Sequence, residues 1–430
     1  MTRLLILGAG ISGQAAARLA RNHGMRVTLY DETLSVADVG EGVGIATGVW
    51  DPVLLDGIDQ VVVSPGFSER SMPVVDVLEY GLPIWSEIEF AYRHLDSPLA
   101  AVTGTNGKTS VTEATAGMLD ASGLDAHATG NIGAALSDFA DTRYDALVVE
   151  VSSFQLRFTE QFHPEAAAIT NVAVDHLDWH GSPYSYRDAK AMIFANQTSA
   201  DLLVYDGDDE GATELAGRAP SELFAVSGRR VPEGGGGFDG RSLRIGDVAV
   251  DVADLKSQDP THLVNLACAA ALALRMGATP EGVIQGAISF APGAHRRTVV
   301  ADIGGVTWVD DSKATNPHAA LASIRAHDSV VLIAGGLAKG IDLAPLAGED
   351  NVKLILGIGE AGPSLVAAAG ERGRLVGTLE IAVAAAADVA RPGDTVLLAP
   401  GCASFDQFSS YGERGDRFAE LVHERTETQR

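Results

Sequence analysis

Cysteine and basic residues are scarce in this sequence. The 430 residues include only two cysteines, Cys268 and Cys402, each in an apolar context, so neither a disulfide framework nor metal binding by cysteine is expected. Such a chain fits a reducing compartment. The 31 Lys and Arg face 57 Asp and Glu, which gives a formal net charge of −26. Nucleic acids and anionic membranes need concentrated basic surfaces, so neither is expected as a partner.

Long apolar runs are missing as well. The N-terminal stretch MTRLLILGAG is interrupted by Gly8 and Gly10, which leaves an apolar run too short for a secretory signal. The alanine-rich runs at 266–274 and 382–390 are too short to cross a bilayer. We therefore expect a cytoplasmic, soluble protein without a membrane partner. We also expect it to be a monomer.

The sequence is 46% hydrophobic, which is enough for two or three domains with sizeable cores. Strand-like apolar runs alternate with helix-length segments, as is typical of parallel sheets covered by helices. The pattern restarts twice along the chain. It predicts an α/β protein of three domains: a Rossmann-like domain at 1–95, a central P-loop ATPase-like domain at 96–294 and a Rossmann-like C-terminal domain at 295–430.

Short apolar runs give the expected strands, and longer segments give the helices. Strands are expected at 3–7, 27–30, 60–63, 99–102, 147–151, 166–170, 202–205, 299–303, 306–310, 330–334, 353–357 and 395–398. Helices are expected at 109–119, 262–275 and 280–289. The four glycines at 234–237 are expected to form the tip of a hairpin, without chemistry of their own.

A glycine pattern follows the first strand. Gly8, Gly10 and Gly13 have the G-x-G-x-x-G spacing, and Asp31 ends the next strand. This pattern alone suggests NAD, but it cannot identify the nucleotide. It indicates only that the backbone can approach a diphosphate and that a carboxylate lies near a ribose. A second approach to a ligand is expected at the sharp turn 64–66. Both could instead be tight turns of a doubly wound sheet.

A phosphate-binding loop is suggested by AVTGTNGKTSV at 101–111, although the strict pattern G-x-x-x-x-G-K-[ST] would need a glycine at Val102. The expected strand, the turns at Gly104 and Gly107 and the following helix arrive in the right order for amide groups to face a phosphate. Lys108 would reach the terminal phosphates, and Thr109 could bind Mg²⁺. An ordinary strand-to-helix turn is the alternative.

Candidate metal ligands follow two later strands. Glu150 ends an apolar strand, so its carboxylate should emerge at the carboxyl edge of the sheet beside the phosphate loop, where Mg²⁺ can use it. A solvated glutamate at a strand end is the alternative. Asp175 and His176 follow another strand, but a lone histidine is more often structural. A structural role is also the default for the remaining histidines that we considered: His163, His180, His295 and His318.

The third domain contains WVDDSKATNPHA, in which a strand ends in paired acids. Lys313 and Thr315 follow these acids, and Pro317 is well placed to begin a helix. These charges could serve as a ligand site or as a solvated loop with a helix cap.

Taken together, the motifs TGTNGKT, EVSSFQL, NVAVDHLD, YRDAK and DDSKATN, in this order and spacing, resemble the Mur ligases of peptidoglycan synthesis. The resemblance runs from Leu4 to Phe418, and TGTNGK[ST] is the family's own version of the phosphate loop. With LLAPGCASFDQFSSYGERGDRF, the chain most resembles the member that adds D-glutamate to UDP-N-acetylmuramoyl-L-alanine.

The resemblance implies ATP-dependent amide synthesis: the γ-phosphate passes to the substrate carboxylate, and the amine of D-glutamate attacks the resulting acyl phosphate. The implied catalytic residues are Lys108, Glu150, His176 and Lys190, and two Mg²⁺ ions are held by Thr109, Glu150, His176 and a carbamylated Lys190. The implied ATP site comprises Gly104, Thr105, Asn106, Gly107, Lys108, Thr109, Ser110, Asn265, Arg296 and Asp311. The implied UDP-sugar site comprises Gly10, Ile11, Ser12, Asp31, Ser64, Gly66, Asn131 and Ser153. The implied D-glutamate site comprises Lys313, Thr315, Lys339, Ser404, Phe405 and Tyr411.

The chain departs from the family pattern at three places. The family's H-N-x-x-N appears as THLVN, with Asn265 kept but Thr261 and His262 substituted; Leu337 replaces an acidic residue, and Tyr411 replaces a phenylalanine. The D-N-P-R motif of members that add meso-diaminopimelate is missing from the sequence, and folylpolyglutamate synthetase has no UDP-binding domain of this type. A nicotinamide dehydrogenase and a non-catalytic nucleotide-binding regulator are the remaining alternatives.

Overall fold

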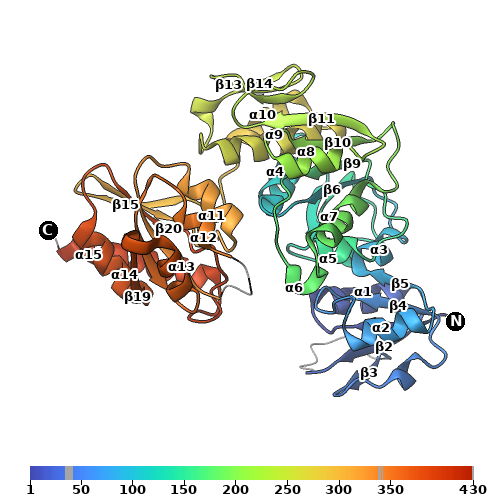
Figure 1. The fold of residues 1–430 in the computed structure, drawn as a ribbon. Coiled ribbons are helices and arrows are strands. Elements are labelled where there is room, and N and C mark those ends of the chain that lie inside the picture. Colours follow the sequence, from blue (N-terminus) through green and yellow to red (C-terminus); the bar gives the residue numbers. More distant parts are fainter. Residues whose placement is uncertain (34–41, 338–339, 341, 429–430) are drawn as a thin grey trace. The chain divides into compact units, whose positions relative to one another are not determined.

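The computed structural model describes residues 1–33, 42–337, 340 and 342–428. It divides the chain into two units, Met1–Ala291 and Pro292–Arg430, which are treated separately below. The first unit contains two sheets and the second unit contains a third (Figure 1). The predicted domain border near residue 95 falls inside the first unit and stays a prediction.

The first sheet has the strand order β3-β2-β1-β4-β5, and every neighbouring pair is parallel. Its strands are β1 (Arg3–Leu7), β2 (Arg26–Asp31), β3 (Gly44–Thr47), β4 (Gln60–Val63) and β5 (Ile84–Ser86). Its helices are α1 (Ile11–Asn22), α2 (Met72–Glu79) and α3 (Glu87–Tyr92), with the 3₁₀ turn η1 (Pro52–Leu55). Leu4–Leu7 of β1 is buried throughout, as expected for a central strand with both faces covered.

The second sheet has the order β14-β13-β12-β11-β10-β9-β6-β8-β7; it is parallel from β7 to β12 and antiparallel from β12 to β14. Its strands are β6 (Leu99–Thr103), β7 (Ala126–Gly130), β8 (Ala146–Glu150), β9 (Ala166–Ile169), β10 (Leu202–Asp206), β11 (Glu222–Ser227), β12 (Gly236–Phe238), β13 (Ser242–Ile245) and β14 (Val248–Asp251). Its helices are α4 (Lys108–Ala121), α5 (Ser153–Leu156), α6 (Leu177–His180), α7 (Pro183–Ala191), α8 (Glu210–Ala216), α9 (Pro260–Arg275) and α10 (Pro280–Ser289). Three 3₁₀ turns complete it: η2 (Leu136–Asp138), η3 (Met192–Phe194) and η4 (Val252–Asp254).

The glycine run at 234–237 is not the hairpin tip that the sequence predicts. Gly236 and Gly237 begin β12, which pairs with β11 on one side and β13 on the other. A side chain on Gly237 would overlap the carbonyl oxygens of Ser227 and Arg230, so glycine is needed here for close strand packing. The tip of the β12–β13 hairpin follows at residues 239–241.

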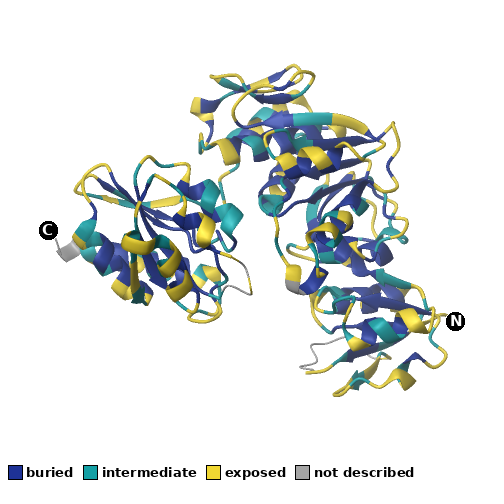
Figure 2. Cartoon of the chain, viewed as in Figure 1, coloured by how far each residue is buried: buried dark blue, intermediate teal, exposed yellow. Residues whose placement is uncertain are grey.

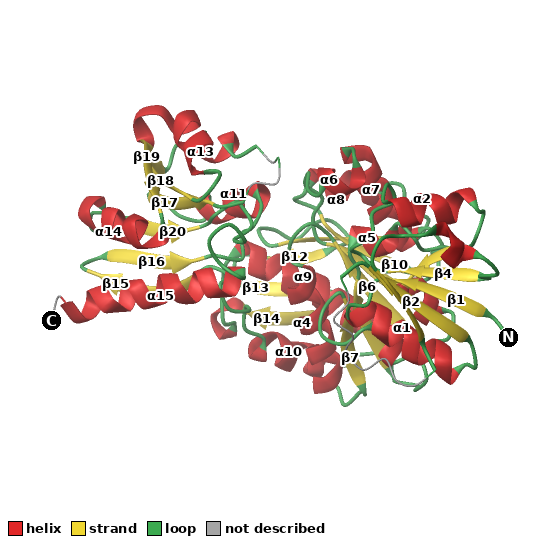
Figure 3. Ribbon diagram, turned by 90° about the horizontal axis from the view of Figure 1, so that it is seen from below, coloured by secondary structure: helices red, strands yellow, loops and turns green. Residues whose placement is uncertain are grey.

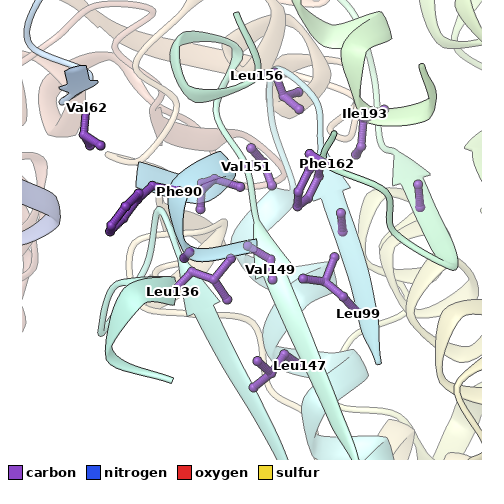
Figure 4. Close-up of a cluster of buried hydrophobic side chains, with 14 of the residues drawn as sticks. Val62, Phe90, Leu99, Leu136, Leu147, Val149, Val151, Leu156, Phe162 and Ile193 are labelled. Carbon is purple, nitrogen blue, oxygen red and sulfur yellow. The ribbon is translucent and has the colours of Figure 1, made fainter. Parts of the chain in front are cut away.

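The apolar core of the first unit is continuous between its two sheets. Alternate side chains of β6 and β8 face opposite ways, as strand geometry requires, so Leu99, Leu147 and Val149 share one layer. Figure 4 shows these residues in one cluster with Phe90 of α3, and the cluster extends to Val62 of β4. The opposite face of the second sheet packs on α4, α9 and α10. The shared layer explains why the first two sheets form one compact unit.

The second unit has a six-stranded sheet in the order β15-β16-β20-β17-β18-β19, parallel except for the β15–β16 pair. Its strands are β15 (Thr298–Ile303), β16 (Val306–Asp310), β17 (Val330–Gly335), β18 (Val352–Ile358), β19 (Gly373–Gly377) and β20 (Thr395–Leu398). Its helices are α11 (Pro317–Ile324), α12 (Ala344–Ala347), α13 (Gly362–Ala369), α14 (Leu379–Val389) and α15 (Tyr411–Thr428), with η5 (Gly370–Arg372). One core layer lies under α14 and α15 and another under α11, α12 and α13 (Figure 3).

The central strands of the sheets are buried, and the outer faces of the helices are exposed (Figure 2). The three parallel-rich sheets confirm the predicted α/β class. None of the helices in the described part of the chain has the length and apolar character needed to cross a membrane.

A buried carboxyl group lies where the first sheet meets the second. Glu87, at the start of α3, is 1% exposed, and its Oε1 accepts a hydrogen bond of 2.6 Å from the Ser137 amide of η2. Burial raises the pKa of Glu87 to about 7, the nearby Asp138 adds to the rise, and the bonds from Ser137 oppose it. The folded protein therefore binds this proton more tightly than the unfolded chain, whose carboxyl has the ordinary pKa of 4.5.

The stability that this proton confers is complete below pH 4.5 and is lost as the pH rises through about 7. We expect Glu87→Gln, which is neutral at every pH, to raise the Tm at pH 8 by about 2–4 °C and to leave it unchanged at pH 4.5, as measured by calorimetry. Glu89 is the control, because its buried carboxylate accepts amide bonds from residues 160–162 and a bond from Arg93. Glu89→Gln should lower the Tm at pH 8. A Glu87→Gln protein that is less stable than wild type at pH 8 would contradict the raised pKa.

Candidate active site

The phosphate loop joins β6 to α4, as the sequence predicts. Gly104 has φ 150° and a side chain there would overlap Thr170 Oγ1, while Gly107 has φ 84° and a Cβ would lie 2.7 Å from Asn265 Oδ1. Glycine is therefore required at both positions. Val102 is fully buried inside β6, so the loop turns two residues later than the strict pattern assumes.

The loop is held by the segment that follows β9. The amide of Thr105 donates to Asn171 O at 2.9 Å, and the amide of Asn106 donates to Asn171 Oδ1 at 2.8 Å. Thr170 Oγ1 donates to Asn106 O at 2.5 Å. Sequence reasoning gave Thr170 and Asn171 no role, although their position at the carboxyl end of a predicted strand was a usable signal. The two loop amides are bonded within the protein, so an anion would be met mainly by the start of α4.

The N-terminus of α4 supplies the remaining donors. The first helical bond runs from Val111 N to Gly107 O at 3.1 Å, so residues 108–110 form the first turn of the helix. This end favours negative charge through the helix dipole. Lys108 Nζ crosses the loop and donates to Gly104 O at 2.9 Å and Thr105 O at 3.1 Å. The arrangement suits a phosphate group.

Lys190 reaches the same loop from α7. Its Nζ donates to Gly104 O at 2.8 Å and lies 4.5 Å from the centre of the Tyr186 ring. The side chain is 1% exposed. Burial lowers the pKa of Lys190 well below its ordinary value, the charge of Lys108 lowers it further, and the carboxylates of Asp175 and Glu150 oppose the shift. The environment therefore favours the neutral amine.

Glu150 lies at the end of β8 and is 2% exposed. Its Oε1 accepts from Asn131 Nδ2 at 2.9 Å, so Asn131 orients this carboxylate. The other oxygen, Oε2, is buried, and it has no hydrogen-bond partner among the described residues. A buried carboxylate oxygen in this state is costly unless a cation completes its surroundings. This orphan oxygen fits a Mg²⁺ ligand.

His176 stands at the start of α6 in a left-handed conformation with φ 51°. Its side chain is about half exposed, its Nε2 lies 3.8 Å from Asp175 Oδ2, and its ring meets that of Phe154 edge-on at 4.8 Å. Thr109 lies in the first turn of α4. Among the described residues no three His, Cys, Asp or Glu side chains form a metal cluster. The predicted ligand set has one Glu and one His, so it depends on oxygen atoms from Thr109 and from a modified Lys190.

The glycine loop of the first sheet has the geometry of a ligand approach. Gly13 packs so tightly on Gly8 O that a side chain would overlap it. Among the described residues, no atom beyond the adjacent residues of the chain lies within 4 Å of a Cβ built on Gly10 or Gly66. Asp31 Oδ2 accepts from Ala9 N at 2.9 Å and so fixes the loop. Gly10 is thus open at the N-terminus of α1, where a diphosphate can bind.

Of the other predicted UDP-sugar contacts, three lie at the glycine loop and Ser153 lies elsewhere, in a buried position. Ser64 Oγ donates to Gly8 O at 3.4 Å, so Ser64 lies at the glycine loop. Ile11, which is 70% exposed, and Ser12 follow Gly10 on the first turn of α1. Ser153 is buried, and its Oγ shares a hydrogen bond of 2.9 Å with His180 Nε2. The His180 ring stacks on Phe154 at 5.5 Å, which supports the structural role expected for this histidine.

In the second unit, predicted D-glutamate residues gather where β16 and β20 end. Lys313 Nζ donates to Tyr411 OH at 2.7 Å and lies 3.9 Å from the centre of its ring. The hydroxyl that distinguishes this tyrosine from the phenylalanine expected in the family therefore orients a lysine. The amide of Thr315 donates to Lys313 O at 2.8 Å. Ser404 is buried and Phe405 is 64% exposed. Lys339 lies outside the described residues.

Arg414 organises this edge and was missed by sequence reasoning. It is 1% exposed, and its guanidinium donates to Ser312 O and Oγ, both at 2.9 Å, and to Cys402 O. Burial lowers the pKa of Arg414 to about 10. The residue joins the loop that bears Lys313 to the loop that bears Ser404. Its only sequence signal was a charged residue on the apolar side of a helix.

The predicted nucleotide contacts lie in both units. Asn265 of α9 is buried against Gly107 in the first unit. In the second unit, burial raises the pKa of Asp311 to about 6, and its Oδ1 accepts from the Arg297 amide at 3.2 Å. Arg296 lies beside Gly293 in the segment before β15. His262, which replaces an asparagine of the family's H-N-x-x-N pattern, is buried, and its ring stacks on Phe290 with 6.0 Å between the ring centres.

Comparison with known proteins supports one family. Models described as "Mur ligase middle domain" and "Mur ligase, glutamate ligase domain" match residues 102–228 and 295–402. A protein of Frankia casuarinae named UDP-N-acetylmuramoylalanine–D-glutamate ligase is 40% identical over 98% of this chain and 94% of its own length. A Streptomyces avermitilis protein of the same name is 36% identical over 97% of each. A pseudomurein peptide ligase type C from Methanothermus fervidus has the same fold, with 17% identity, a TM-score of 0.61 and coverage of 99% of this chain and 100% of its own. The chain belongs to the Mur ligase family, among the UDP-N-acetylmuramoylalanine–D-glutamate ligases.

Proposed function

We propose that this protein uses ATP to join D-glutamate to UDP-N-acetylmuramoyl-L-alanine, as a monomer in the cytoplasmic synthesis of peptidoglycan precursors. Near-full-length identity of 36–40% with relatives named for this reaction carries the proposal. Residues 1–95 would bind the UDP-sugar, 96–294 would bind ATP, and 295–430 would bind the amino acid. The open glycine loop, the phosphate loop and the Lys313–Tyr411 pair support these three roles.

The first chemical step needs two anions to meet. A carboxylate oxygen of UDP-N-acetylmuramoyl-L-alanine attacks the γ-phosphorus of ATP, the bond to ADP breaks, and an acyl phosphate forms. Lys108 and the first amides of α4 hold the phosphates and offset their charge. Glu150 and Thr109 would hold one Mg²⁺, and His176 and carbamylated Lys190 the other. Bound Mg²⁺ would supply further charge neutralisation between substrate and nucleotide.

The surroundings of Lys190 support the proposal that it is carbamylated. The neutral amine favoured by burial forms a bond to CO₂ and releases a proton, so a cationic side chain becomes an anionic one. The product offers carboxylate-like oxygens, the ligand type that Mg²⁺ prefers. An ammonium at this position would instead repel the metal ions.

The second chemical step forms the amide bond. The amine of D-glutamate attacks the acyl carbonyl, phosphate leaves, and a proton is lost from nitrogen. In this proposal Lys313, held by Tyr411, binds a carboxylate of D-glutamate by charge. Thr315, Ser404, Phe405 and Lys339 complete that site, and Asn265, Arg296 and Asp311 contact the nucleotide.

A substrate panel tests the proposal. We expect phosphate release from ATP only when UDP-N-acetylmuramoyl-L-alanine and D-glutamate are both present, with none for L-glutamate or meso-diaminopimelate in place of D-glutamate. Calorimetry on the full chain should detect the UDP-substrate and give no heat with NADH. Phosphate release that ignores either substrate, or tight NADH binding without a response to the UDP ligand, would overturn the proposed function.

A further inference from the structure

The loop after β4 contacts two helices of the second sheet. This loop, residues 64–71, includes the proposed UDP-sugar contacts Ser64 and Gly66 as well as an adjacent acid and base. Glu69 Oε2 accepts from Arg157 Nε at 2.6 Å, and Arg157 is the C-cap of α5. Arg70 Nη2 donates to Trp179 O at 3.1 Å in α6. Two neighbouring residues of opposite charge thus hold two different helices.

Both helices follow proposed metal ligands. Helix α5 begins at Ser153, shortly after Glu150 ends β8, and His176 is the N-cap of α6. A shift of either helix would therefore move a proposed ligand of Mg²⁺. Metal sites tolerate such shifts poorly because Mg²⁺ demands near-ideal octahedral geometry.

Packing makes the connection stiff. Gly181 ends α6 with φ 76°, and a Cβ there would lie 3.3 Å from the guanidinium of Arg70, so the cation lies flat against this turn. Phe158 and Trp179 belong to the apolar core on the α2 face of the first sheet. Phe154 packs against this cluster and carries the His176 ring on its edge. The loop and the helices therefore pack closely against one another, so a displacement of one is resisted by the others.

We propose that Glu69 and Arg70 are positioning residues that couple occupation of the UDP-sugar loop to the placement of Glu150 and His176. The inference rests on the proposed function, because it takes the loop as the UDP-sugar site. A ligand that fixes the loop fixes both helices, and the reverse holds by thermodynamic linkage. The Glu69–Arg157 pair is partly exposed, with side chains 21% and 48% accessible, so it adds little to overall stability and acts through geometry.

Calorimetry measures this coupling directly. The Kd of UDP-N-acetylmuramoyl-L-alanine is determined alone and with Mg²⁺ plus a non-hydrolysable ATP analogue, and the ratio of the two values is the coupling. We expect a ratio of about fivefold or more for the wild type, and a ratio below about twofold for Arg70→Gln and for Glu69→Gln. The Kd of the UDP-substrate alone should stay within about twofold in both variants.

A matched control separates this role from general docking of the first sheet. Arg18 of α1 bonds Asp138 of η2 at 2.8 Å, another ionic link between the layers that does not involve the loop. Arg18→Gln should keep the wild-type ratio. The charge swap Glu69→Arg with Arg157→Glu should restore the ratio that Glu69→Gln loses.

An unchanged ratio in Arg70→Gln, the same loss in Arg18→Gln, or a failure of the charge swap to restore the ratio would each overturn the inference. Loss of UDP-substrate binding by Arg70→Gln in the absence of the analogue would also overturn it, because Arg70 would then be a direct ligand contact. Failure of the proposed function itself appears separately, as a wild-type protein that is inactive on the substrate panel.

Discussion

Lys108→Ala is expected to abolish ligase turnover while leaving the fold intact. The Lys108 ammonium is the cation that crosses the phosphate loop, and it bonds the carbonyls of Gly104 and Thr105 at 2.9 and 3.1 Å. Its loss removes a positive charge directed at the phosphoryl group that is transferred, and kcat should fall by about 10²–10³-fold or more. Because no apolar packing is lost, the stability cost should be only about 1 kcal/mol. Steady-state phosphate release and thermal unfolding measure the two effects.

The matched control is Lys256→Ala, an exposed lysine of the same unit. It should keep full activity and the wild-type Tm. Near-normal turnover in Lys108→Ala would remove the phosphate-loop assignment. Loss of activity together with a large fall in Tm would show instead that the lysine holds the loop together.

The sequence predicted central strands better than edge strands. β1, β4, β6 and β17 are buried apolar runs, because a parallel strand covered on both faces needs no polar residue. β3 and β19 are edge strands with exposed or half-buried residues, and neither was predicted. The edge strand β15 was predicted because it contains an apolar run, whereas β3 and β19 are short and contain glycine, so neither gives a clear apolar signal.

The local geometry of the candidate site was predictable where neighbouring residues define it. The glycines at 104 and 107 and Lys108 lie in one short motif, and local backbone geometry explains all three. The contacts that complete the site join distant parts of the chain, such as Asn106 with Asn171 and Ser312 with Arg414. Spacing along one sequence gives no information about such pairs, since they depend on which strands become neighbours in the sheet.

Lys190→Ala is expected to be nearly inactive and to recover partly when short carboxylic acids are added. The wild-type side chain is buried beside Gly104, so its removal leaves a small cavity where the proposed carbamate lies. The lowered pKa of Lys190 favours the neutral amine from which a carbamate forms. Formate or acetate can enter such a space and offer the missing oxygen ligand to Mg²⁺. Activity should rise with the concentration of the acid and saturate, as binding to one site requires.

Chloride at the same ionic strength is the control for the salt effect, and Lys108→Ala is the control for the site. Chloride should not restore the activity of Lys190→Ala, because it cannot replace a carboxylate. Carboxylic acids should not restore the activity of Lys108→Ala, because Lys108 is proposed to contact phosphate.

In the wild type, the carbamate forms from the neutral amine and CO₂, so removal of bicarbonate and CO₂ should lower activity slowly and reversibly. Mass spectrometry of the intact protein under CO₂ should show a mass increase of about 44 Da in the wild type, because the carbamate adds one CO₂ to the lysine nitrogen. Lys190→Ala should show no such increase. Full activity of Lys190→Ala without any additive would refute the carbamate, because the ligand set would then be complete without it.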